Sequence, residues 1–439
     1  MLHFNFHFPS KITFIHNLKI ISQLFPFLNR LFFFLFLFIT FLLISNACSS
    51  SKRFTSNEES YKKGESNSGL NSIRILLDEK PAAIYATIQN KVYLFNEKRK
   101  IAEVNNGNTI ECYCNPETVS IKIGRQNFIG RYFQIVAADG NAVKYNGKSY
   151  KGSLRIVSTG KSVLLLNFVD LENYLKGVIA KEMPLGSGNE NYEALKAFAI
   201  CARTYAAARM YEGNPLYDIF PDVRDQVYGG EDAERTISNK AVDETSGMIL
   251  TYNGEPAKVY YHSTCGGETE NVENVFPKPA VPYLVSVEDG SGPYCSISPR
   301  YKWVEEYTDE DIIQELYESN LIPNTNYKLD DMEIAEKFNS GRVKDLKIIL
   351  RSNDGSKEIH LYGNEIRSKL RTPAKNLMLW STLFEINESG NKIIINGKGY
   401  GHGVGFCQWG AIGRSQAGQS YTEILDHYFP GTTLGKVND

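Results

Sequence analysis

The first 47 residues contain no aspartate and no glutamate. Basic residues do occur there, at Lys11, Lys19 and Arg30, ahead of an apolar run from Leu31 to Ile44. That run is shorter than the ~20 residues needed to span a bilayer, but it has the length of the hydrophobic segment of an export signal. The missing acidic residues and the short run together predict a signal peptide over residues 1–47.

A small residue precedes a cysteine where the predicted signal ends. The sequence from Ser45 to Cys48, SNAC, resembles a lipobox, in which the cysteine becomes diacylated. Cys48 is therefore predicted to carry a lipid anchor; ordinary cleavage nearby and an uncleaved anchor are the alternatives. Residues 48–72 are polar and predict a flexible tether. We expect an exported, membrane-anchored lipoprotein that faces the periplasm or the cell wall.

Blocks of Lys and Arg are also missing. The chain has 48 Lys+Arg against 50 Asp+Glu, a formal net charge of −2, and loss of residues 1–47 would take away only basic charges. No basic amphipathic helix is evident either. These absences argue against a nucleic acid as partner, whereas a glycan is compatible with them. The lack of an HExxH motif disfavours a zinc amidase or peptidase.

Short β-type runs separated by turn signals fill residues 73–168. Ile73–Leu77, Val92–Phe95 and Val119–Ile123 are examples, with NG, DG and NGK turns between such runs. From residue 169 to 435, helical and strand patterns are mixed and do not alternate strictly. The sequence therefore predicts an α+β fold, with a β-rich N-terminal module over 73–168 and a mixed α+β region over 169–435.

Two helices are predicted just after the β-rich module. Asp170 is well placed to cap the first, and Pro184 stops it, because a residue before proline is pushed out of the helical region. Glu182 then lies at or just past the helix end, beside a turn. The second helix is expected from Tyr192 to Tyr211, where many alanines allow close packing.

Glycine recurs at alternate positions from Gly397 to Gly405, within the segment GKGYGHGVGFCQWGA. Glycine at this density is tolerated where φ is positive or where a close approach to the backbone is required. A groove for a polymer or ligand would need such an approach. A tight hairpin with glycine bulges is the alternative.

Several sequence blocks between Asp170 and Leu434 follow one another in the same order as the sequence motifs of one protein family. They are DLENYLKGVIAKEMP (170–184), EALKAFAICARTYAAAR (193–209), DQVYGG (225–230), YYHSTCGG (260–267), GHGVGFCQWGA (401–411) and YTEILDHYFPGTTL (421–434). In these blocks the chain resembles the SpoIID/LytB family, stage II sporulation protein D and its relatives. The resemblance implies a peptidoglycan lytic transglycosylase that cleaves MurNAc–GlcNAc bonds. Some relatives are known mainly as enhancers of a cell-wall amidase, so a non-catalytic, peptidoglycan-binding enhancer is the alternative.

A lytic transglycosylase can work with one carboxyl group, whereas glycoside hydrolases usually use two. The C6 hydroxyl of the muramic sugar attacks its own anomeric carbon, so one side chain can donate a proton and later accept one. The KEMP motif (181–184) matches the family block that carries the catalytic glutamate, which implies Glu182 as acid and base. The resemblance further implies glycan strands without stem peptides as the substrate, and hence cooperation with an amidase. The chemistry itself requires no cofactor.

Other side chains of these blocks are expected to line the substrate groove. Arg203 offers a rigid donor fork for a sugar or carboxylate, or alternatively bridges backbone carbonyls. Tyr228 could equally belong to the core, and His402 could be a strut bonded to the backbone. The predicted substrate-binding residues are Lys196, Arg203, Tyr205, Gln226, Tyr228, His402 and Gln408.

Soft metal ligands form a further cluster. His262 and Cys265 are three residues apart, and Cys295 follows in a loop rich in Gly and Pro. A structural zinc ion held by these residues would need a fourth ligand, for which water, His402 and Cys407 are candidates. A Cys265–Cys295 disulfide is the competing interpretation, because it suits an exported protein.

Overall fold

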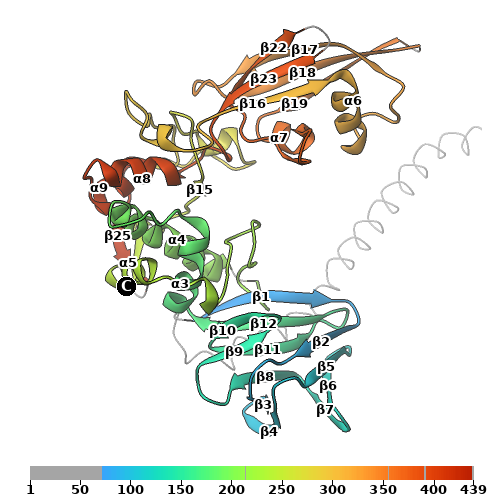
Figure 1. The fold of residues 1–439 in the computed structure, drawn as a ribbon, viewed down its shortest axis with the longest axis vertical. Helices are drawn as coiled ribbons and strands as arrows, with labels where there is room; N and C mark the ends of the chain where they lie inside the picture. Colours follow the sequence, from blue (N-terminus) through green and yellow to red (C-terminus); the bar gives the residue numbers. More distant parts are fainter. Residues whose placement is uncertain (1–71, 213, 354, 390–391, 438–439) are drawn as a thin grey trace, which may run out of the picture. The chain divides into compact units, whose positions relative to one another are not determined.

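The computed structural model describes residues 72–212, 214–353, 355–389 and 392–437 (Figure 1). The predicted signal peptide, almost all of the tether and the proposed lipid-bearing Cys48 lie outside these residues. Among the described helices, none is both long enough and apolar enough to cross a membrane.

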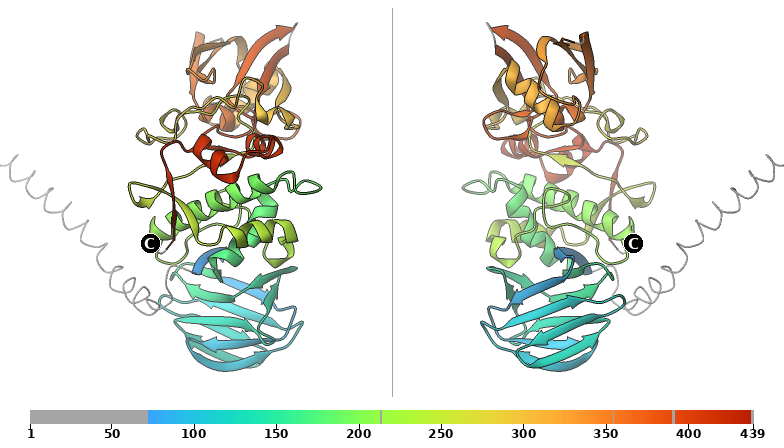
Figure 2. Two further views of the ribbon diagram at one scale, coloured as in Figure 1. Left: turned by 90° about the vertical axis from the view of Figure 1, so that its left-hand side faces the viewer. Right: turned by 90° about the vertical axis from the view of Figure 1, so that its right-hand side faces the viewer.

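The segment from Ser72 to Asp170 consists of strands, as its alternating pattern predicts (Figure 2). Every second side chain of β8 is buried, so one face of the strand packs on the core. One sheet has the order β1-β12-β11-β8-β3-β4, another has the order β2-β5-β6-β7, and β9 pairs with β10. The strands are β1 (Ser72–Lys80), β2 (Ala83–Thr87), β3 (Val92–Asn96), β4 (Arg99–Val104), β5 (Thr109–Cys114), β6 (Val119–Ile123), β7 (Gln126–Gly130), β8 (Tyr132–Ala137), β9 (Ala142–Tyr145), β10 (Lys148–Lys151), β11 (Ser153–Ser158) and β12 (Val163–Asp170).

Helices surround α4 (Tyr192–Glu212), whose predicted bounds are confirmed within one residue. Its buried alanines let α3 (Leu171–Glu182), α5 (Thr236–Glu244), α8 (Gln408–Gln416) and α9 (Tyr421–Tyr428) pack against it. The same continuous core includes strands of the β-rich segment. Short strands and 3₁₀ turns complete this part: η2 (Glu231–Ala233), β13 (Met248–Tyr252), β14 (Glu255–Pro256), β15 (Tyr261–His262), η3 (Val272–Asn274), η4 (Tyr294–Ile297), β24 (Phe406–Cys407) and β25 (Thr433–Lys436).

The residues between Lys302 and Lys398 have a hydrophobic core of their own. Trp303, Leu346 and Ile395 are among the buried side chains of this second core. It is built on two three-stranded sheets, β16-β23-β22 and β17-β18-β19. The elements are β16 (Lys302–Thr308), α6 (Asp309–Glu318), β17 (Lys328–Lys337), β18 (Val343–Ser352), β19 (Gly355–Tyr362), α7 (Glu365–Lys369), β20 (Arg371–Thr372), β21 (Leu377–Met378), β22 (Phe384–Ser389) and β23 (Lys392–Lys398). Strands make up 40% and helices 23% of the residues that the structure describes, in mixed order, so the predicted α+β class is confirmed.

Gly177 in α3 allows the loop before η2 to lie directly against the helix. A Cβ at this position would lie 2.6 Å from Cε2 of Tyr228 and 2.9 Å from the carbonyl oxygen of Gly230. The N–H of Gly229 donates to the carbonyl oxygen of Gly177 (3.0 Å). This contact fixes the loop beside the end of α3, where Glu182 lies.

Replacement of Gly177 by alanine is expected to destabilise the protein. The added methyl group overpacks the contact with Tyr228, which costs about 1–3 kcal/mol, and the better helix propensity of alanine recovers only part of that. Gly292→Ala is the matched control, because nothing lies within 4 Å of a Cβ there. Guanidinium unfolding should show a lower midpoint for Gly177→Ala alone. Equal midpoints for the two variants would contradict the close packing of the loop.

Candidate active site and cysteine cluster

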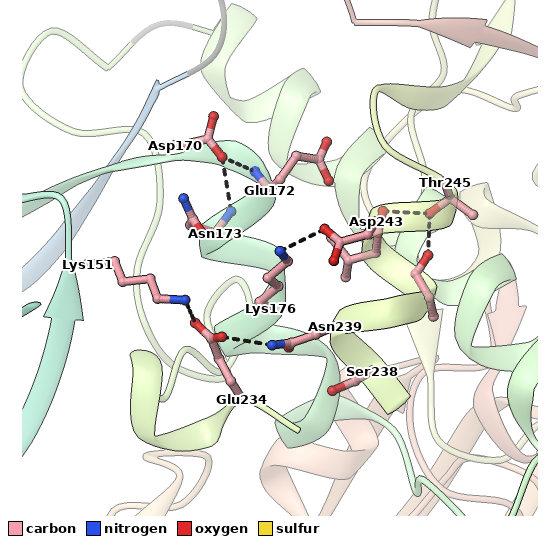
Figure 3. A network of polar contacts seen from close by, with 12 residues as sticks. Lys151, Asp170, Glu172, Asn173, Lys176, Glu234, Ser238, Asn239, Asp243 and Thr245 are labelled. Carbon is pink, nitrogen blue, oxygen red and sulfur yellow. Dashed lines mark hydrogen bonds and ion pairs between the residues drawn. The ribbon is translucent and has the colours of Figure 1, made fainter. Parts of the chain in front are cut away.

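The start of helix α3 is capped as the sequence predicts. The Asp170 carboxylate accepts hydrogen bonds from the backbone N–H groups of Glu172 and Asn173 (3.0 and 3.1 Å; Figure 3). Lys176, further along the helix, forms an ion pair with Asp243 of α5 (2.7 Å; Figure 3). Both contacts restrain the direction of the helix, and with it the position of its last residue.

Glu182 is that last residue, and its carboxyl group is partly buried. Met183 is already extended (φ −119°, ψ 138°) before Pro184, as predicted from the proline. The N–H of Val227 donates to Oε1 of Glu182 (2.6 Å). The hydroxyl of Tyr261 lies beside the carboxyl group and donates to the carbonyl oxygen of Asp225 (3.4 Å). Burial raises the pKa of Glu182 above its usual value, and the Val227 N–H and the Tyr261 hydroxyl partly oppose that rise.

No ion-pair partner of Glu182 occurs among the residues that the structure describes. A nearby cation would favour the carboxylate and lower its pKa. Its absence leaves burial as the largest influence on the carboxyl group. A raised pKa favours the protonated form of the Glu182 carboxyl group, which is the form that can donate a proton.

Tyr261 connects Glu182 to two of the predicted site residues. Gln226 lies beside the Tyr261 side chain, accepts a hydrogen bond at Oε1 from the hydroxyl of Tyr174 (3.2 Å) and donates to the carbonyl oxygen of Ala202 (3.4 Å). Nε2 of His402 donates to the carbonyl oxygen of Tyr261 (2.9 Å). Gln226 is fully buried and therefore does not face a groove. This position corrects the predicted direct contact between Gln226 and a sugar.

His402 is neutral and bonded to the backbone on both sides of its ring. Its Nδ1 accepts from the N–H of Val404 (3.0 Å), so Nε2 carries the proton. Burial, with Arg367 nearby, lowers the pKa of His402 to about 3. Of the two interpretations of this histidine, the geometry favours the strut.

A second carboxylate, Asp225, lies in the same neighbourhood but is fully occupied. Its oxygens accept from the hydroxyl of Tyr205 (2.7 Å) and the N–H of Phe220 (2.8 Å), and it forms an ion pair with Arg209 (3.1 Å). The Asp225 side chain is only 2% exposed. A carboxylate so committed is poorly placed to activate a water molecule.

Arg203 lies in the core, which corrects its predicted role in the groove. Its side chain is fully buried, and Nε and Nη2 bind the Glu172 carboxylate (2.8 and 2.7 Å). The same guanidinium donates to the carbonyl oxygens of Met248 (3.0 Å) and Val242 (3.2 Å). Arg203 therefore joins α4 to α3, α5 and β13, and it has no donor left for a ligand.

Tyr228, Gln408 and Lys196 also make their contacts within the protein. Tyr228 is buried and donates to Asn167 (3.0 Å), so the core interpretation is the one observed. Gln408 is the first residue of α8 and is buried. Lys196 pairs with Glu193 (2.7 Å). Among the predicted groove residues, the structure gathers Tyr205, Gln226 and His402 around Glu182 and Tyr261.

The glycine-rich segment packs against the backbone of the YYHSTCGG block. Gly399, Gly401, Gly403 and Gly405 all have positive φ, which confirms the prediction from their spacing. A Cβ at Gly401 would lie 2.7 Å from Cβ of His262. The close approach that these glycines allow is therefore to the protein's own chain.

This packing brings together three cysteines and a histidine from distant segments. The Sγ atoms of Cys265 and Cys295 are 3.4 Å apart, and the described cysteines are free thiols. The ligand atoms of His262, Cys265 and Cys407 lie within 4.8 Å of one another, as do those of Cys265, Asp289 and Cys295. The Cys407 thiol also accepts from the N–H of Cys265 (3.2 Å) and of Gly410 (3.3 Å).

His262 has the geometry of a metal ligand. Its Nδ1 faces the carbonyl oxygen of Val404 (3.1 Å), which assigns the proton to Nδ1. Its Nε2 is buried and has no hydrogen-bond partner. A lone pair on a buried nitrogen beside the thiols of Cys265 and Cys407, with Cys295 next to Cys265, fits the donor set of a structural zinc site. From the sequence, Cys407 was only one of three candidates for the fourth zinc ligand; in the structure it lies beside His262 and Cys265.

Two family models match segments of this chain. Residues 159–252 match "Stage II sporulation protein", and residues 295–405 match a domain of unknown function, which includes the second core. An uncharacterized protein of Brachyspira hyodysenteriae is 32% identical over 373 residues, covering 84% of this chain and 94% of the relative. Stage II sporulation protein D of Bacillus subtilis is 31% identical over 286 residues, covering 62% and 76%.

The amidase enhancer of Bacillus subtilis is 29% identical over 412 residues, and the alignment covers 81% of this chain but 56% of the relative. The fold is an α+β arrangement in which Glu182, a partly buried carboxyl group with a raised pKa, lies at the end of α3. The chain belongs to the SpoIID/LytB family, as its sequence blocks predict. This membership supports a role related to the cell wall.

Tyr261, Val227 and Asp225 are the contributors that sequence reasoning missed. Tyr261 and Asp225 lie in blocks that the family resemblance quotes, YYHSTCGG and DQVYGG, but their chemistry is common in protein cores. Val227 contributes only its backbone N–H, for which no side-chain signal exists. The available signal for Tyr261 was its position next to His262, a candidate metal ligand, in the block YYHSTCGG.

Proposed function

We propose that this protein is a peptidoglycan lytic transglycosylase that cleaves MurNAc–GlcNAc bonds and leaves 1,6-anhydro-MurNAc ends. The observation that carries the proposal is the environment of Glu182: a partly buried carboxyl group with a raised pKa, a hydrogen bond from the Val227 N–H and no ion pair among the described residues. Family membership supports the cell-wall context.

Glu182 would act in both halves of the reaction. Its protonated carboxyl group donates a proton to the glycosidic oxygen as the bond to the anomeric carbon breaks. The C6 hydroxyl of the same muramic sugar then bonds to that carbon, and its proton passes to the Glu182 carboxylate. The protein ends in its starting state and no water is consumed. Because Asp225 is occupied by Tyr205, Phe220 and Arg209, a one-carboxyl route is favoured over two-carboxyl hydrolysis.

Mass spectrometry of glycan strands without stem peptides tests this proposal. Wild type is expected to produce anhydro ends, and Glu182→Gln is expected to lose at least a hundredfold in rate, because the amide cannot donate and accept the proton. Glu190→Gln is the matched control, since Glu190 is an exposed glutamate a short distance along the chain. Products one water heavier, or full activity of Glu182→Gln, would overturn the assignment.

A non-catalytic amidase enhancer is the second candidate, and the similarity to the Bacillus subtilis amidase enhancer favours it. In that case a cell-wall amidase acting on intact peptidoglycan would be stimulated equally by wild type and Glu182→Gln. If the protein is instead a transglycosylase, Glu182→Gln cleaves no strands, and it should stimulate the amidase less than wild type does.

We further propose that His262, Cys265, Cys295 and Cys407 hold a structural zinc ion. The orphaned Nε2 of His262 and the three clustered thiols support this ligand set, which ties the YYHSTCGG block to η4 and β24. A bound zinc ion would supply cross-linking of these segments, and no step of the proposed reaction passes through it.

Metal analysis of the purified chain should find about one zinc ion per molecule. Cys407→Ser is expected to lower the zinc content, whereas Cys201→Ser should not, because Cys201 is buried in α4 outside the cluster. A Cys265–Cys295 disulfide detected in zinc-free protein would exclude the metal site in favour of the competing interpretation.

We also propose that the protein is exported and anchored by lipid on Cys48. Labelling of the expressed full chain with a radioactive fatty acid is expected to mark wild type and Cys201→Ser but not Cys48→Ser. Labelling of Cys48→Ser would show that this cysteine is not the site of acylation.

A further inference from the structure

Residues 214–219 lie along the edge of the β-rich segment, ahead of the loop that reaches the candidate acid. Ile219 forms a parallel bridge with Ile75 of β1, the edge strand of its sheet, and its carbonyl oxygen accepts from a backbone N–H of the same strand (3.0 Å). The carbonyl oxygen of Arg74 in turn accepts from the N–H of Asp218 (2.8 Å). The segment is therefore paired with β1 through its backbone.

The side chain of Arg74 binds the same segment at three residues. Its Nε and Nη2 donate to the two oxygens of the Asp218 carboxylate (3.1 and 2.6 Å), so this contact is bidentate. Its Nη1 donates to the carbonyl oxygen of Pro215 (2.8 Å), and Nη2 also donates to that of Asn214 (2.7 Å). The Asp218 side chain is only 4% exposed. A planar guanidinium with these acceptors fixes the direction of the segment as well as its position.

Apolar packing holds the segment to the sheet as well. The rings of Tyr217 and Phe220 lie 5.1 Å apart, and Leu216 joins them. These side chains form a small cluster, separate from the main core, with buried residues of β1, β11 and β12, namely Leu76, Val157, Leu164 and Leu166. Separation of the segment from the sheet would expose this cluster to water, so the two parts are expected to stay together.

Hydrogen bonds within the following loop connect this attachment to the Val227 N–H. The Asp225 carboxylate accepts from the N–H of Phe220 (2.8 Å), and the carbonyl oxygen of Pro221 accepts from the N–H of Tyr228 (3.1 Å). These contacts close the stretch between Phe220 and Tyr228 on itself. Val227 lies within it, and its N–H is the group that donates to the candidate acid (2.6 Å).

The far end of the loop is also held by the β-rich segment. The Tyr228 hydroxyl donates to Asn167 of β12 (3.0 Å), and Glu234 beyond the loop forms an ion pair with Lys151 of β10 (2.7 Å; Figure 3). Arg74 and Lys151 both precede residue 159, where the match to the stage II sporulation protein model begins. The contacts that hold this loop thus extend beyond the part of the chain that the family model covers.

We propose that Arg74 is a positioning residue of the candidate active site. It clamps residues 214–219 to β1, and through the loop that follows it holds the Val227 N–H against the Glu182 carboxyl group. The inference rests on the proposed function of Glu182. The β-rich segment then belongs to the catalytic unit, which gives residues 73–168 a role that their sequence pattern did not reveal.

Amide hydrogen exchange of the full chain tests the inference without substrate. Glu182→Ala lacks the acceptor and gives the exchange rate of an unbonded Val227 N–H. In Arg74→Met this N–H is expected to exchange about tenfold faster than in wild type, the equivalent of roughly one charge-assisted hydrogen bond. Arg131→Met is the matched control, because Arg131 forms its ion pair with Glu97 elsewhere in the β-rich segment (3.1 Å). An unchanged Val227 rate in Arg74→Met, or an equal increase in Arg131→Met, would overturn the inference.

Exchange in β18 separates positioning from general unfolding. This strand belongs to the second core, so its amides should exchange alike in wild type and in the variants. If Arg74→Met does not fold, the double variant Arg74→Met/Asp218→Asn takes its place, because it also removes the carboxylate left buried without its partner. The same increase at Val227 is expected. Equal acceleration of β18 and Val227 in both variants would mean that Arg74 supports the fold as a whole, and it would contradict the positioning role.

Cleavage kinetics separate this inference from the proposed function. Arg74→Met is expected to lower kcat about tenfold with little change in KM, because it displaces the partner of Glu182 and removes no contact with the substrate. Arg74→Lys restores the ion pair with Asp218 without the fork, so it should recover part of the loss. Faster Val227 exchange in Arg74→Met, together with a wild type that cleaves no glycan, would support the clamp and remove the transglycosylase. Cleavage by wild type with an unchanged kcat in Arg74→Met would keep the transglycosylase and overturn the clamp.

Discussion

The burial of one carboxyl group at the end of a helix is the constraint on which the rest of the site depends. Water around Glu182 would return its pKa to the usual range, and a neighbouring cation would lower it further. The structure limits both, because the loop that carries Val227 contacts the end of α3 and no ion pair to Glu182 occurs among the described residues. Gly177 allows the loop to approach, the Val227 N–H binds the carboxyl group, and Tyr261 reaches it from β15.

Two further interactions keep this arrangement in place. The fully buried Arg203 and its partner Glu172 join α4 to the first turn of α3, and a buried charge that lost its partner would be strongly unfavourable. The glycine-rich segment lies against the backbone of His262 and Tyr260, and it thereby aligns His402 with Tyr261. Several residues expected to meet the substrate thus make their contacts within the protein.

Local signals predicted local structure well. The Asp170 cap, the extended Met183 before Pro184 and the bounds of α4 follow from interactions within a few residues, so they could be predicted from the sequence. Burial and partners could not, because they depend on segments far apart in the chain. Arg203 and Tyr228 have the side chains of sugar-binding residues and still belong to the core. The sequence patterns did not separate the second core near Trp303 from the rest of the region 169–435, because its contacts join segments far apart in the chain.

The most direct test of the central claim is to run the cleavage reaction in water enriched in oxygen-18. If Glu182 is the single acid and base and the C6 hydroxyl is the nucleophile, no heavy oxygen enters the new chain ends. Incorporation of one oxygen-18 atom at each new reducing end would mean that water attacks the anomeric carbon. That result would require a second catalytic group and would contradict the account.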